Sequence, residues 1–451
     1  MEIKKHRARF QEARAELEAK TKESARASQR ASESLALEVV QTVVMPHPIY
    51  IESAEAGRLT DVDGNVYIDL TAGFGPNVLG NRPEPVQKAL AEQIERGWHF
   101  GIHNTRQAEL AELICQAGAC AESVIFSNSG TEATMYAARL ARAYTGKTKV
   151  ALFDGSYHGV HDYALTKAAP NSPRSQPAAA SLGNGVPKLI PDQTMLMLPY
   201  RDPATFELIR RHRDEIAVVQ IEPVQSSNPR LDSGDFLGEL IDVCRKNDVL
   251  VLFDEVITGF RIEYGGAQEY YGLEPDLVTY GKAIGGGLPV GAVAGRAEIM
   301  NCFTGKDGAP FIFCGGTFSG NPLTMAAGTA AVTAMRDQKD TLYPYLHEQG
   351  SRFREAVNRY CAQEKIPAQV MSAGSLLHLF FQPGAIQGQR DIVHQHREIE
   401  AQFYLHLINH GVIIPGIHVA FFSGAHTTSE INQVIEAFKA SFEALRDDGA
   451  F

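Results

Sequence analysis

Lys282 and Asp254 have side chains that are costly to bury and yet follow apolar runs. Lys282 comes after residues 277–281, and three glycines follow at 285–287. A lysine in such a position is often desolvated so that its amine can act as a nucleophile. Asp254 directly follows the run 249–253, where a buried carboxylate needs a cation or a hydrogen-bond donor as its partner. Taken singly, a surface lysine and a helix-capping aspartate are the simpler interpretations.

A third stretch could bind an anion. The apolar run 123–126 leads into the segment 127–133, in which a glycine lies where a helix is predicted to begin. The N–H groups at such a helix end, together with the hydroxyls of Ser129 and Thr131, suit a phosphate. Ser129 and Glu132 also have the spacing of a capping box, so a simple helix start is the alternative.

Two further strand ends carry side chains that could serve a ligand. Tyr157 and His158 follow the apolar run 149–153, and the tyrosine ring could stack on a planar ligand or fill the core. Glu222 follows another apolar run and opens a Glu-Pro turn. His158 and His161 lie three apart, but no third metal ligand stands nearby, so we expect no metal site.

These strand ends together match one ligand. In open α/β sheets, ligands bind outside the carboxyl ends of the strands. A protonated ring nitrogen needs the carboxylate, an aldehyde needs the lysine, and a phosphate needs the glycine-containing turn. Those groups are the three ends of pyridoxal 5′-phosphate. The sequence therefore predicts a site for this cofactor.

Alternating helices and apolar strands predict one large α/β domain over residues 81–328. Its strands are short Val, Ile and Leu runs without polar alternation, which is typical of a mostly parallel sheet with both faces covered. A segment rich in Pro, Ser and Ala at 167–187 is predicted to be a long loop.

The remaining residues predict a smaller α+β domain. Residues 36–80 contribute antiparallel strands with turn residues at 63–65, and residues 329–451 contribute helices and sparse strands. The last helix is preceded by a capping-box pattern at 427–430. Residues 1–35 are charged and predicted to be helical, with an apolar stripe so thin that we expect the helix to fray or to pack on a partner subunit.

The composition limits the classes of function. The chain has 451 residues and a formal net charge of −11, which disfavours a surface for nucleic acid or anionic membranes. Its six cysteines include no CxxC pair and are expected to be reduced thiols. No apolar run is long enough to span a membrane, and the charged N-terminal segment is unlike a signal peptide. We therefore expect a cytoplasmic enzyme.

The motifs resemble those of one family. Five segments occur in family order and at family-like spacing: Ser127–Ala133, Tyr157–Gly159, Asp254–Arg261, Lys282–Gly291 and Gly316–Pro322. They are similar to class III pyridoxal-phosphate aminotransferases, and most of all to the glutamate-1-semialdehyde aminomutase branch. The resemblance extends over residues 48–445 and implies a fold-type I homodimer with both active sites at the subunit interface.

The resemblance also implies a role for each residue. Lys282 forms the Schiff base with the cofactor and carries the proton, and Asp254 pairs with the ring nitrogen. Tyr157 stacks on one face of the ring, Val256 packs on the other, and Glu222 orients the site. The remaining cofactor-binding positions are Ser129, Gly130, Thr131, His158 and, toward the neighbouring subunit's cofactor, Thr317.

The substrate side departs from the aminomutase branch. That branch has an arginine for the substrate carboxylate, and the corresponding residues 43–48 of this chain contain no arginine. The branch also has a glutamate before its Ala-His-Thr segment, and His418 stands at that position here. Ser227 stands where the ornithine and 4-aminobutyrate members have a carboxylate. A carboxylate substrate therefore has no evident bidentate partner.

We expect an aminotransferase that moves an amino group from a donor amino acid to an aldehyde, ketone or keto-acyl acceptor, which could be tethered to a carrier protein. The pocket wall is predicted to include His47, Tyr50 and residues 417–422. The alternatives are a glutamate-1-semialdehyde-type aminomutase and an epimerase or decarboxylase with the same cofactor, since the sequence does not show which bond at Cα is aligned. A non-catalytic scaffold is disfavoured because Lys282, Asp254 and the phosphate turn are all present.

Overall fold

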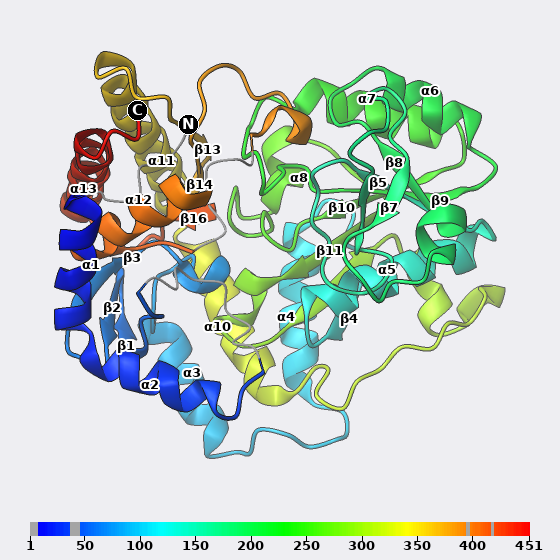
Figure 1. The fold of residues 1–451 in the computed structure, drawn as a ribbon. Helices are drawn as coiled ribbons and strands as arrows, with labels where there is room; N and C mark the ends of the chain where they lie inside the picture. Colours follow the sequence, from blue (N-terminus) through cyan, green and yellow to red (C-terminus); the bar gives the residue numbers. More distant parts are fainter. Residues whose placement is uncertain (1–7, 37–45, 394–396, 416–418) are drawn as a thin grey trace. The chain divides into compact units, whose positions relative to one another are not determined.

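The chain folds into two compact units (Figure 1). The computed structural model describes residues 8–36, 46–393, 397–415 and 419–451. The first unit comprises Met1–Pro83, Pro344–Ala385 and Asp391–Phe451, and the second comprises Glu84–Tyr343 and Ile386–Arg390. The expected boundary at 328 falls inside helix α10, which belongs to the second unit and packs there against helices α3 and α4. These helices are α3 (Glu84–Ile94), α4 (Thr105–Ala117) and α10 (Pro322–Asp337).

The second unit is built on one mixed sheet of seven strands in the order β4-β12-β11-β10-β9-β5-β8. β12 runs antiparallel to both of its neighbours, and the pairs from β11 to β8 are parallel. The mostly parallel sheet is thus confirmed, and β12 is an antiparallel strand that its Gly- and Ala-rich sequence did not signal. The strands are β4 (Ser123–Ser127), β5 (Lys149–Phe153), β8 (Met195–Leu198), β9 (Ile216–Ile221), β10 (Leu250–Asp254), β11 (Leu277–Gly281) and β12 (Gly291–Gly295).

Both faces of this sheet are covered, which explains the apolar strands. Val150 and Leu152 of β5 lie in one hydrophobic core with helix α5, whereas Ala151 and Phe153 lie in another with helices α6 and α7 (Figure 1). Because neither face meets water, the strands have no polar alternation. The helices are α5 (Gly130–Thr145), α6 (Ala204–Arg211) and α7 (Gly234–Arg245).

The segment predicted to be a long loop contains a hairpin. β6 (Thr166–Ala168) and β7 (Ala179–Ser181) pair antiparallel, and the prolines at 170, 173 and 177 lie in the connection between them. The prediction of a loop over all of 167–187 was therefore wrong. The proline-rich composition marks the connection of a short hairpin.

The first unit holds two small sheets with the strand orders β1-β2-β3-β15 and β13-β14-β16. The predicted turn at 63–65 is confirmed, since Asp61 Oδ1 accepts the N–H groups of Asp63 and Asn65 at 3.0 and 2.7 Å. Thr427 and Glu430 make the predicted capping box of α13. The elements are β1 (Ile51–Glu55), β2 (Arg58–Asp61), β3 (Val66–Asp69), α11 (Lys339–Gln363), β13 (Gln369–Ala373), β14 (Leu376–Phe380), α12 (Arg397–Asn409), β15 (Val412–Ile413), β16 (Val419–Phe421) and α13 (Thr428–Asp447).

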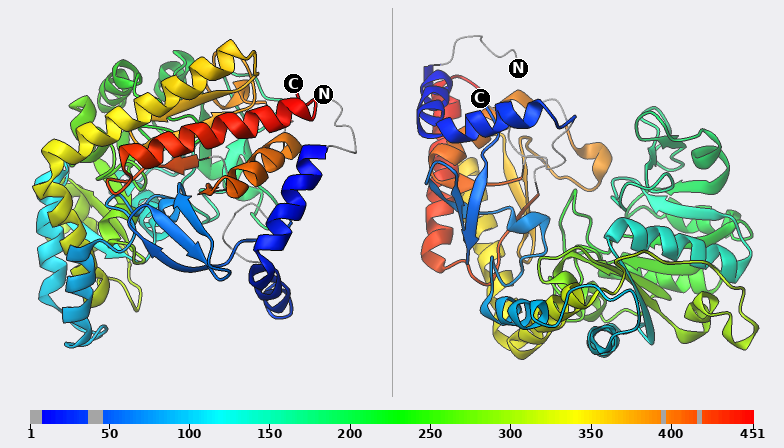
Figure 2. Two further views of the ribbon diagram at one scale, coloured as in Figure 1. Left: turned by 90° about the vertical axis from the view of Figure 1, so that its left-hand side faces the viewer. Right: turned by 90° about the horizontal axis from the view of Figure 1, so that it is seen from below.

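The N-terminal segment forms two helices, α1 (Ala8–Lys20) and α2 (Lys22–Ser32), and α1 packs on α12 and α13 (Figure 2). Leu17 is 1% exposed and belongs to a hydrophobic cluster with residues of α12. The Asp448 carboxylate accepts the N–H groups of Arg9 and Phe10 at 3.0 and 2.9 Å and so caps α1. The described part of this segment is therefore not frayed, because the thin apolar stripe of α1 packs within the same unit, and packing on a partner subunit stays a prediction.

Two global expectations concern thiols and membranes. Each of the six cysteines is a free thiol. In the described ranges, no helix is long and apolar enough to cross a membrane.

Candidate active site

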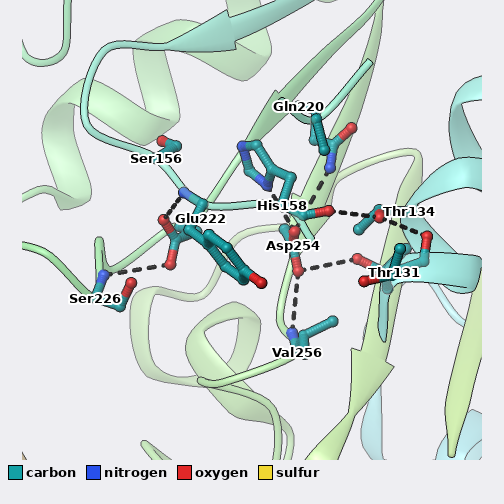
Figure 3. Close-up of polar contacts among 12 residues, drawn as sticks. Thr131, Thr134, Ser156, His158, Gln220, Glu222, Ser226, Asp254 and Val256 are labelled. Atoms are coloured by element: carbon teal, nitrogen blue, oxygen red, sulfur yellow. Dashed lines mark hydrogen bonds and ion pairs between the residues drawn. The ribbon is translucent and has the colours of Figure 1, made fainter. Parts of the chain in front are cut away.

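Five strands of the second unit end at one edge of its sheet with the side chains singled out by the sequence. Carboxyl ends of parallel strands lie at the same edge, where ligands of open α/β sheets bind. Figure 3 shows the contacts that join several of these residues. The positions are Ser129–Thr131 after β4, Tyr157 and His158 after β5, Glu222 after β9, Asp254 at the end of β10, and Lys282 after β11.

Asp254 and His158 form a buried pair (Figure 3). They are 4% and 3% exposed, and His158 Nδ1 lies 2.6 Å from Asp254 Oδ2. This nitrogen donates, because an ionised carboxylate only accepts. The other ring nitrogen, Nε2, is buried and has no hydrogen-bond partner within the described part of the chain. The pair therefore gives the carboxylate a donor and fixes the orientation of the imidazole.

The second oxygen of Asp254 is held by groups that sequence reasoning missed. Oδ1 accepts hydrogen bonds from the Val256 N–H and the Thr279 hydroxyl, both at 3.2 Å, and Gln220 Nε2 lies 3.5 Å from Oδ2. Thr279 stands opposite Asp254 in the parallel register of β10 and β11. The only sequence signal for Thr279 was a polar residue inside an apolar run. The residues of a single strand do not show which residue of the neighbouring strand will lie opposite.

Lys282 has both an unusual backbone and an unusual electrostatic environment. Its φ of 46° lies in the left-handed region, which a non-glycine residue adopts only where the surrounding structure imposes it. Burial lowers the pKa of the amine to about 8, against the opposing effect of the Glu222 and Asp254 carboxylates. No hydrogen bond or ion pair engages its amine among the described residues. Lys282 therefore holds an amine that is partly neutral near physiological pH.

Glu222 is a buried carboxylate that orients the neighbouring loop. Burial raises the pKa of this carboxyl, although the His158 ring and the Tyr157 N–H act in the opposite direction. Oε2 accepts the N–H of Tyr157 at 2.8 Å, and Oε1 accepts the N–H of Ser226 at 3.2 Å (Figure 3). The Glu-Pro turn after β9 and the loop after β5 are thus joined through one side chain.

Tyr157 does not fill the core. The residue is 56% exposed, so the interpretation of a ring buried for packing alone is excluded. Partial burial, together with the charges of Asp254 and Glu222, raises the pKa of its hydroxyl. Its ring is available to a ligand, while its backbone is fixed by Glu222.

The turn before α5 leaves N–H groups free at a helix N-terminus. Ser129 Oγ accepts the N–H of Glu132 at 3.1 Å, as in a capping box, but the Glu132 carboxylate accepts the N–H of Asn128 at 2.5 Å instead of that of Ser129. The predicted reciprocal box is therefore shifted by one residue. The N–H groups of Gly130 and Thr131 have no hydrogen-bond partner among the described residues. Free N–H groups at the start of a helix attract an anion.

Two glycines permit close approach of chain segments around this turn. A Cβ at Gly130 would lie 2.8 Å from Val256 Cγ1, and one at Gly159 would lie 2.5 Å from Thr131 Oγ1. The hydroxyl of Thr131 also accepts the N–H of Val160 at 3.3 Å. The phosphate-type turn is therefore packed against both the β5 loop and the turn after Asp254.

His161 contacts Thr134 of α5, next to His158. Its Nε2 is 3.2 Å from Thr134 Oγ1, whose hydroxyl also donates to the carbonyl oxygen of His158 at 2.7 Å. Burial lowers the pKa of His161 to about 4. No cluster of potential metal ligands occurs in the described residues.

The residues expected to contact the neighbouring subunit or the substrate do not belong to the strand ends that carry Asp254 and Lys282. Thr317 is exposed. The His47 ring lies 2.8 Å from the Thr21 hydroxyl, in the first unit, and Phe422 is fully buried in the core of that unit. Phe422 is thus a core residue and not part of a pocket wall. The wall residues Ile417 and His418 lie outside the described residues.

A mostly parallel α/β sheet that delivers a lysine, a buried carboxylate and a free helix N-terminus to one edge defines an enzyme that binds a phosphorylated carbonyl cofactor. The chain belongs to the class-III aminotransferases, since the model of the family "Aminotransferase class-III" matches residues 39–441. Enzymes of this family use pyridoxal 5′-phosphate, which is the cofactor of this chain.

Curated relatives and solved structures agree with this family. The chain is 37% identical over 405 residues to a glutamate-1-semialdehyde 2,1-aminomutase of Methanothermobacter thermautotrophicus, covering 89% of this chain and 94% of the relative. An ω-transaminase from Sphaerobacter thermophilus has a similar structure, with a TM-score of 0.88, 31% identity and coverage of 94% and 98%. A β-phenylalanine aminotransferase from Variovorax paradoxus matches with a TM-score of 0.84, 28% identity and 98% coverage of both chains. The fold is that of fold-type I enzymes.

Proposed function

We propose that the chain moves an amino group from a donor amino acid to an aldehyde, ketone or keto-acyl acceptor. The observation that carries this proposal is Lys282, whose pKa is lowered to about 8 and whose amine is not engaged by a hydrogen bond or ion pair among the described residues. A partly neutral lysine beside buried carboxylates is suited to react with a carbonyl group.

The described residues fit the cofactor. The N–H groups of Gly130 and Thr131, with the hydroxyls of Ser129 and Thr131, would hold the phosphate at the start of α5. Tyr157 would lie against one face of the ring and Val256 against the other. Pyridoxal phosphate supplies an aldehyde that reacts with primary amines and a ring that takes up the electrons released at the substrate's Cα.

Asp254 is held by several hydrogen-bond donors. The Val256 N–H, the Thr279 hydroxyl and the His158 ring all donate to it, and together they fix the orientation of the carboxylate. A fixed negative charge at this position would hold the proton on the ring nitrogen. We therefore assign Asp254 the pairing role and His158 a supporting role.

Lys282 is the group that moves the proton. In its neutral form, Nζ would accept the proton from the donor's Cα, and in its charged form it would hold that proton for return. A pKa near the working pH makes both directions accessible. Glu222 positions the loop of Tyr157 beside it.

The acceptor class follows from the substrate side of the sequence. No arginine occurs in residues 43–48, so a free carboxylate lacks its usual partner there. A keto-acyl thioester on a carrier protein carries no such charge and would need no arginine. Two similar structures are described as an ω-transaminase and a β-phenylalanine aminotransferase, which favours transfer between two substrates.

A glutamate-1-semialdehyde-type aminomutase is the second candidate. Relatives with 35–37% identity over most of the chain carry that name. An aminomutase would convert glutamate 1-semialdehyde without an external acceptor, whereas the leading proposal requires one. The two candidates therefore differ in a single measurable requirement.

We also propose a homodimer in the cytoplasm. Several large apolar side chains of the second unit are exposed, which is typical of a surface covered by a partner. Thr317 is next to the exposed Phe318 in the sequence and would reach the phosphate of the partner's cofactor. The free cysteines suit a reducing compartment. The exposed side chains are Trp98 (61%), Ile102 (77%), Phe311 (66%), Phe313 (76%) and Phe318 (59%).

Three measurements test the proposal. The purified protein should take up pyridoxal phosphate with a visible absorbance band that Lys282→Ala abolishes. Single amino donors should convert the bound cofactor in a stable half-reaction, and a panel of acceptors with mass spectrometry should identify the product. A colourless protein that takes up no cofactor would refute the proposal, and turnover of glutamate 1-semialdehyde without an acceptor would favour the aminomutase.

A further inference from the structure

A short strap from the C-terminal third of the chain packs on the active-site loop. We define the strap as Ile386–Arg390; it belongs to the second unit although the residues on both sides of it belong to the first. We define the active-site loop as residues 154–158, which follow β5 and include Tyr157. The strap is not part of any motif that identifies the cofactor site.

Arg390 anchors the strap with all three guanidinium nitrogens, of which one binds this loop and two bind Ser172 in the connection between β6 and β7. Nε donates to Asp154 Oδ2 at 2.5 Å, Nη1 to the Ser172 carbonyl at 2.6 Å, and Nη2 to the Ser172 hydroxyl at 3.2 Å. Both side chains of the ion pair are largely buried, at 20% and 15% exposure. A charge-assisted pair with this geometry and burial is stronger than an ordinary surface ion pair.

The other residues of the strap extend the contact. Arg230 donates to the Ile386 carbonyl at 2.7 Å, which fixes the far end of the strap. A Cβ at Gly155 would lie 2.7 Å from Gln389 Cβ, and the φ of Gly155 is +87°. The strap thus lies directly on the backbone of the loop, at a position where only glycine fits.

Every residue of the loop is consequently held by a different partner. Asp154 binds Arg390, and the Gly155 carbonyl accepts the Ser227 hydroxyl at 2.8 Å. Farther along, Ser156 Oγ lies 3.0 Å from Gln225 Nε2, the Tyr157 N–H donates to Glu222, and the His158 ring donates to Asp254. The strap is the only one of these partners that does not come from the strand ends.

We propose that Arg390, acting through Asp154, is a positioning residue that sets the orientation of Tyr157 toward the cofactor. This inference rests on the proposed function for its catalytic consequence, but the anchoring of the loop can be measured without it. Three of the five N–H donors of Arg390 are engaged inside the chain.

The experiment compares Arg390→Ala, Asp154→Ala and the double variant with a control at the other end of the same strand. Lys149 begins β5 and pairs with Glu215 at 2.6 Å, so Glu215→Ala removes an ion pair of β5 that does not touch the loop. In the cofactor-free protein, amide hydrogen exchange is followed at residues 154–158. In the loaded enzyme, the circular dichroism of the bound cofactor and the rate of the donor half-reaction are measured.

Arg390→Ala and Asp154→Ala should each speed exchange of the loop amides, weaken the cofactor dichroism and slow the half-reaction by up to about 10²-fold, the size of effect that a displacement of about 1 Å in an active site can have. The double variant should be no worse than either single variant, and Arg390→Lys should restore part of the signal. Glu215→Ala should leave all three readouts unchanged.

Two results would overturn the inference. Unchanged loop exchange and dichroism in Arg390→Ala, with a raised KM only for substrates that carry a carboxylate, would assign Arg390 to the substrate. Additive losses in the double variant would show that Arg390 and Asp154 act separately. If the wild-type protein binds no pyridoxal phosphate, the proposed function fails, yet the exchange of the loop amides still decides whether Arg390 anchors the loop.

Discussion

Two loops of the second unit carry motifs assigned to the cofactor, and they differ in how completely they are held. The active-site loop, residues 154–158, is fixed residue by residue by partners within the same unit. In the loop 315–320, the contacts lie on both sides of Thr317: the Gly315 carbonyl accepts the Tyr136 hydroxyl at 2.8 Å, the Ser319 hydroxyl accepts the Asn128 amide at 3.3 Å, and the Gly320 carbonyl accepts the amide of Gln107 at 3.0 Å. Thr317, near its tip, is exposed and has no hydrogen bond among the described residues.

The difference indicates which loop completes its task within one chain. A loop that is anchored along its whole length, like the one with Tyr157, needs no further component to hold its shape. A loop that exposes Thr317 and Phe318 leaves both side chains accessible to a component outside its own unit. We therefore expect Tyr157 to serve the site of its own chain and Thr317 to serve that of a partner subunit.

The largest effect is expected at Asp254, which binds His158 of the active-site loop. Asp254→Asn keeps the size of the side chain but removes the charge opposite the ring nitrogen, and the loss of one preorganised electrostatic group typically lowers kcat by about 10²- to 10³-fold. Thr317→Ala removes a single neutral donor and should weaken cofactor affinity by about tenfold, with little change in kcat once saturated. Cofactor titrations and half-reaction rates measure both. Equal losses of kcat in the two variants would contradict the comparison.

Hybrid dimers test whether each loop serves the site of its own chain or that of the partner chain. When Lys282→Ala chains are mixed with Thr317→Ala chains, the hybrid contains one site with an intact lysine and an intact Thr317 from the partner. That site should regain wild-type cofactor affinity. Mixing Lys282→Ala with Tyr157→Ala should restore nothing, because the lysine and the tyrosine of one site would come from the same chain. Restoration in the second mixture, or failure in the first, would reverse the assignment of the two loops.

The sequence predicted those parts of the site whose signal lies within a few neighbouring residues. Asp254, Lys282 and Glu222 each stand at the end of an apolar run, and a polar residue at the end of a buried strand can be read without knowing what lies beside it. The mostly parallel sheet followed from the same runs, since burial on both faces removes polar alternation.

The parts that depend on pairing between distant segments were missed. Thr279 supports Asp254 only because β10 and β11 pair in one register, and Arg390 meets Asp154 across 236 positions of sequence. The Glu132 carboxylate binds Asn128 and not Ser129, a difference of one residue that spacing alone does not decide. The docking of α1 likewise required the surface of α12, which no local pattern of residues 8–20 reveals.

A moderate effect is expected where the phosphate turn meets the turn after Asp254. Gly130→Ala would place a methyl group 2.8 Å from Val256 Cγ1, so that one of the two segments must move. Overpacking of this kind typically destabilises by about 1–3 kcal/mol, measured by denaturant unfolding of the cofactor-free protein. Val256→Ala should recover part of the loss in the double variant. Gly238→Ala in α7 is the matched control, because its methyl would meet only Leu273 Cδ2 at 3.8 Å; comparable destabilisation in that variant would remove the steric explanation.

The smallest effect is expected on the midpoint of the pH dependence of cofactor uptake. Only the neutral amine of Lys282 reacts with an aldehyde, so the rate of uptake by the cofactor-free protein should rise about tenfold per pH unit below the lysine pKa of about 8 and level off above it.

Glu222→Gln tests the cause of that midpoint. The Glu222 carboxylate opposes the effect of burial by favouring the charged amine, so its removal should lower the midpoint, by less than one pH unit, while the amide oxygen of the glutamine still accepts the Tyr157 N–H. Stopped-flow absorbance between pH 6 and 10 measures the shift. Because Thr317 is uncharged and does not contribute to the pKa shift of Lys282, Thr317→Ala should leave the midpoint in place. A midpoint that rises in Glu222→Gln, or moves in Thr317→Ala, would mean that the Glu222 carboxylate does not set the charge of Lys282.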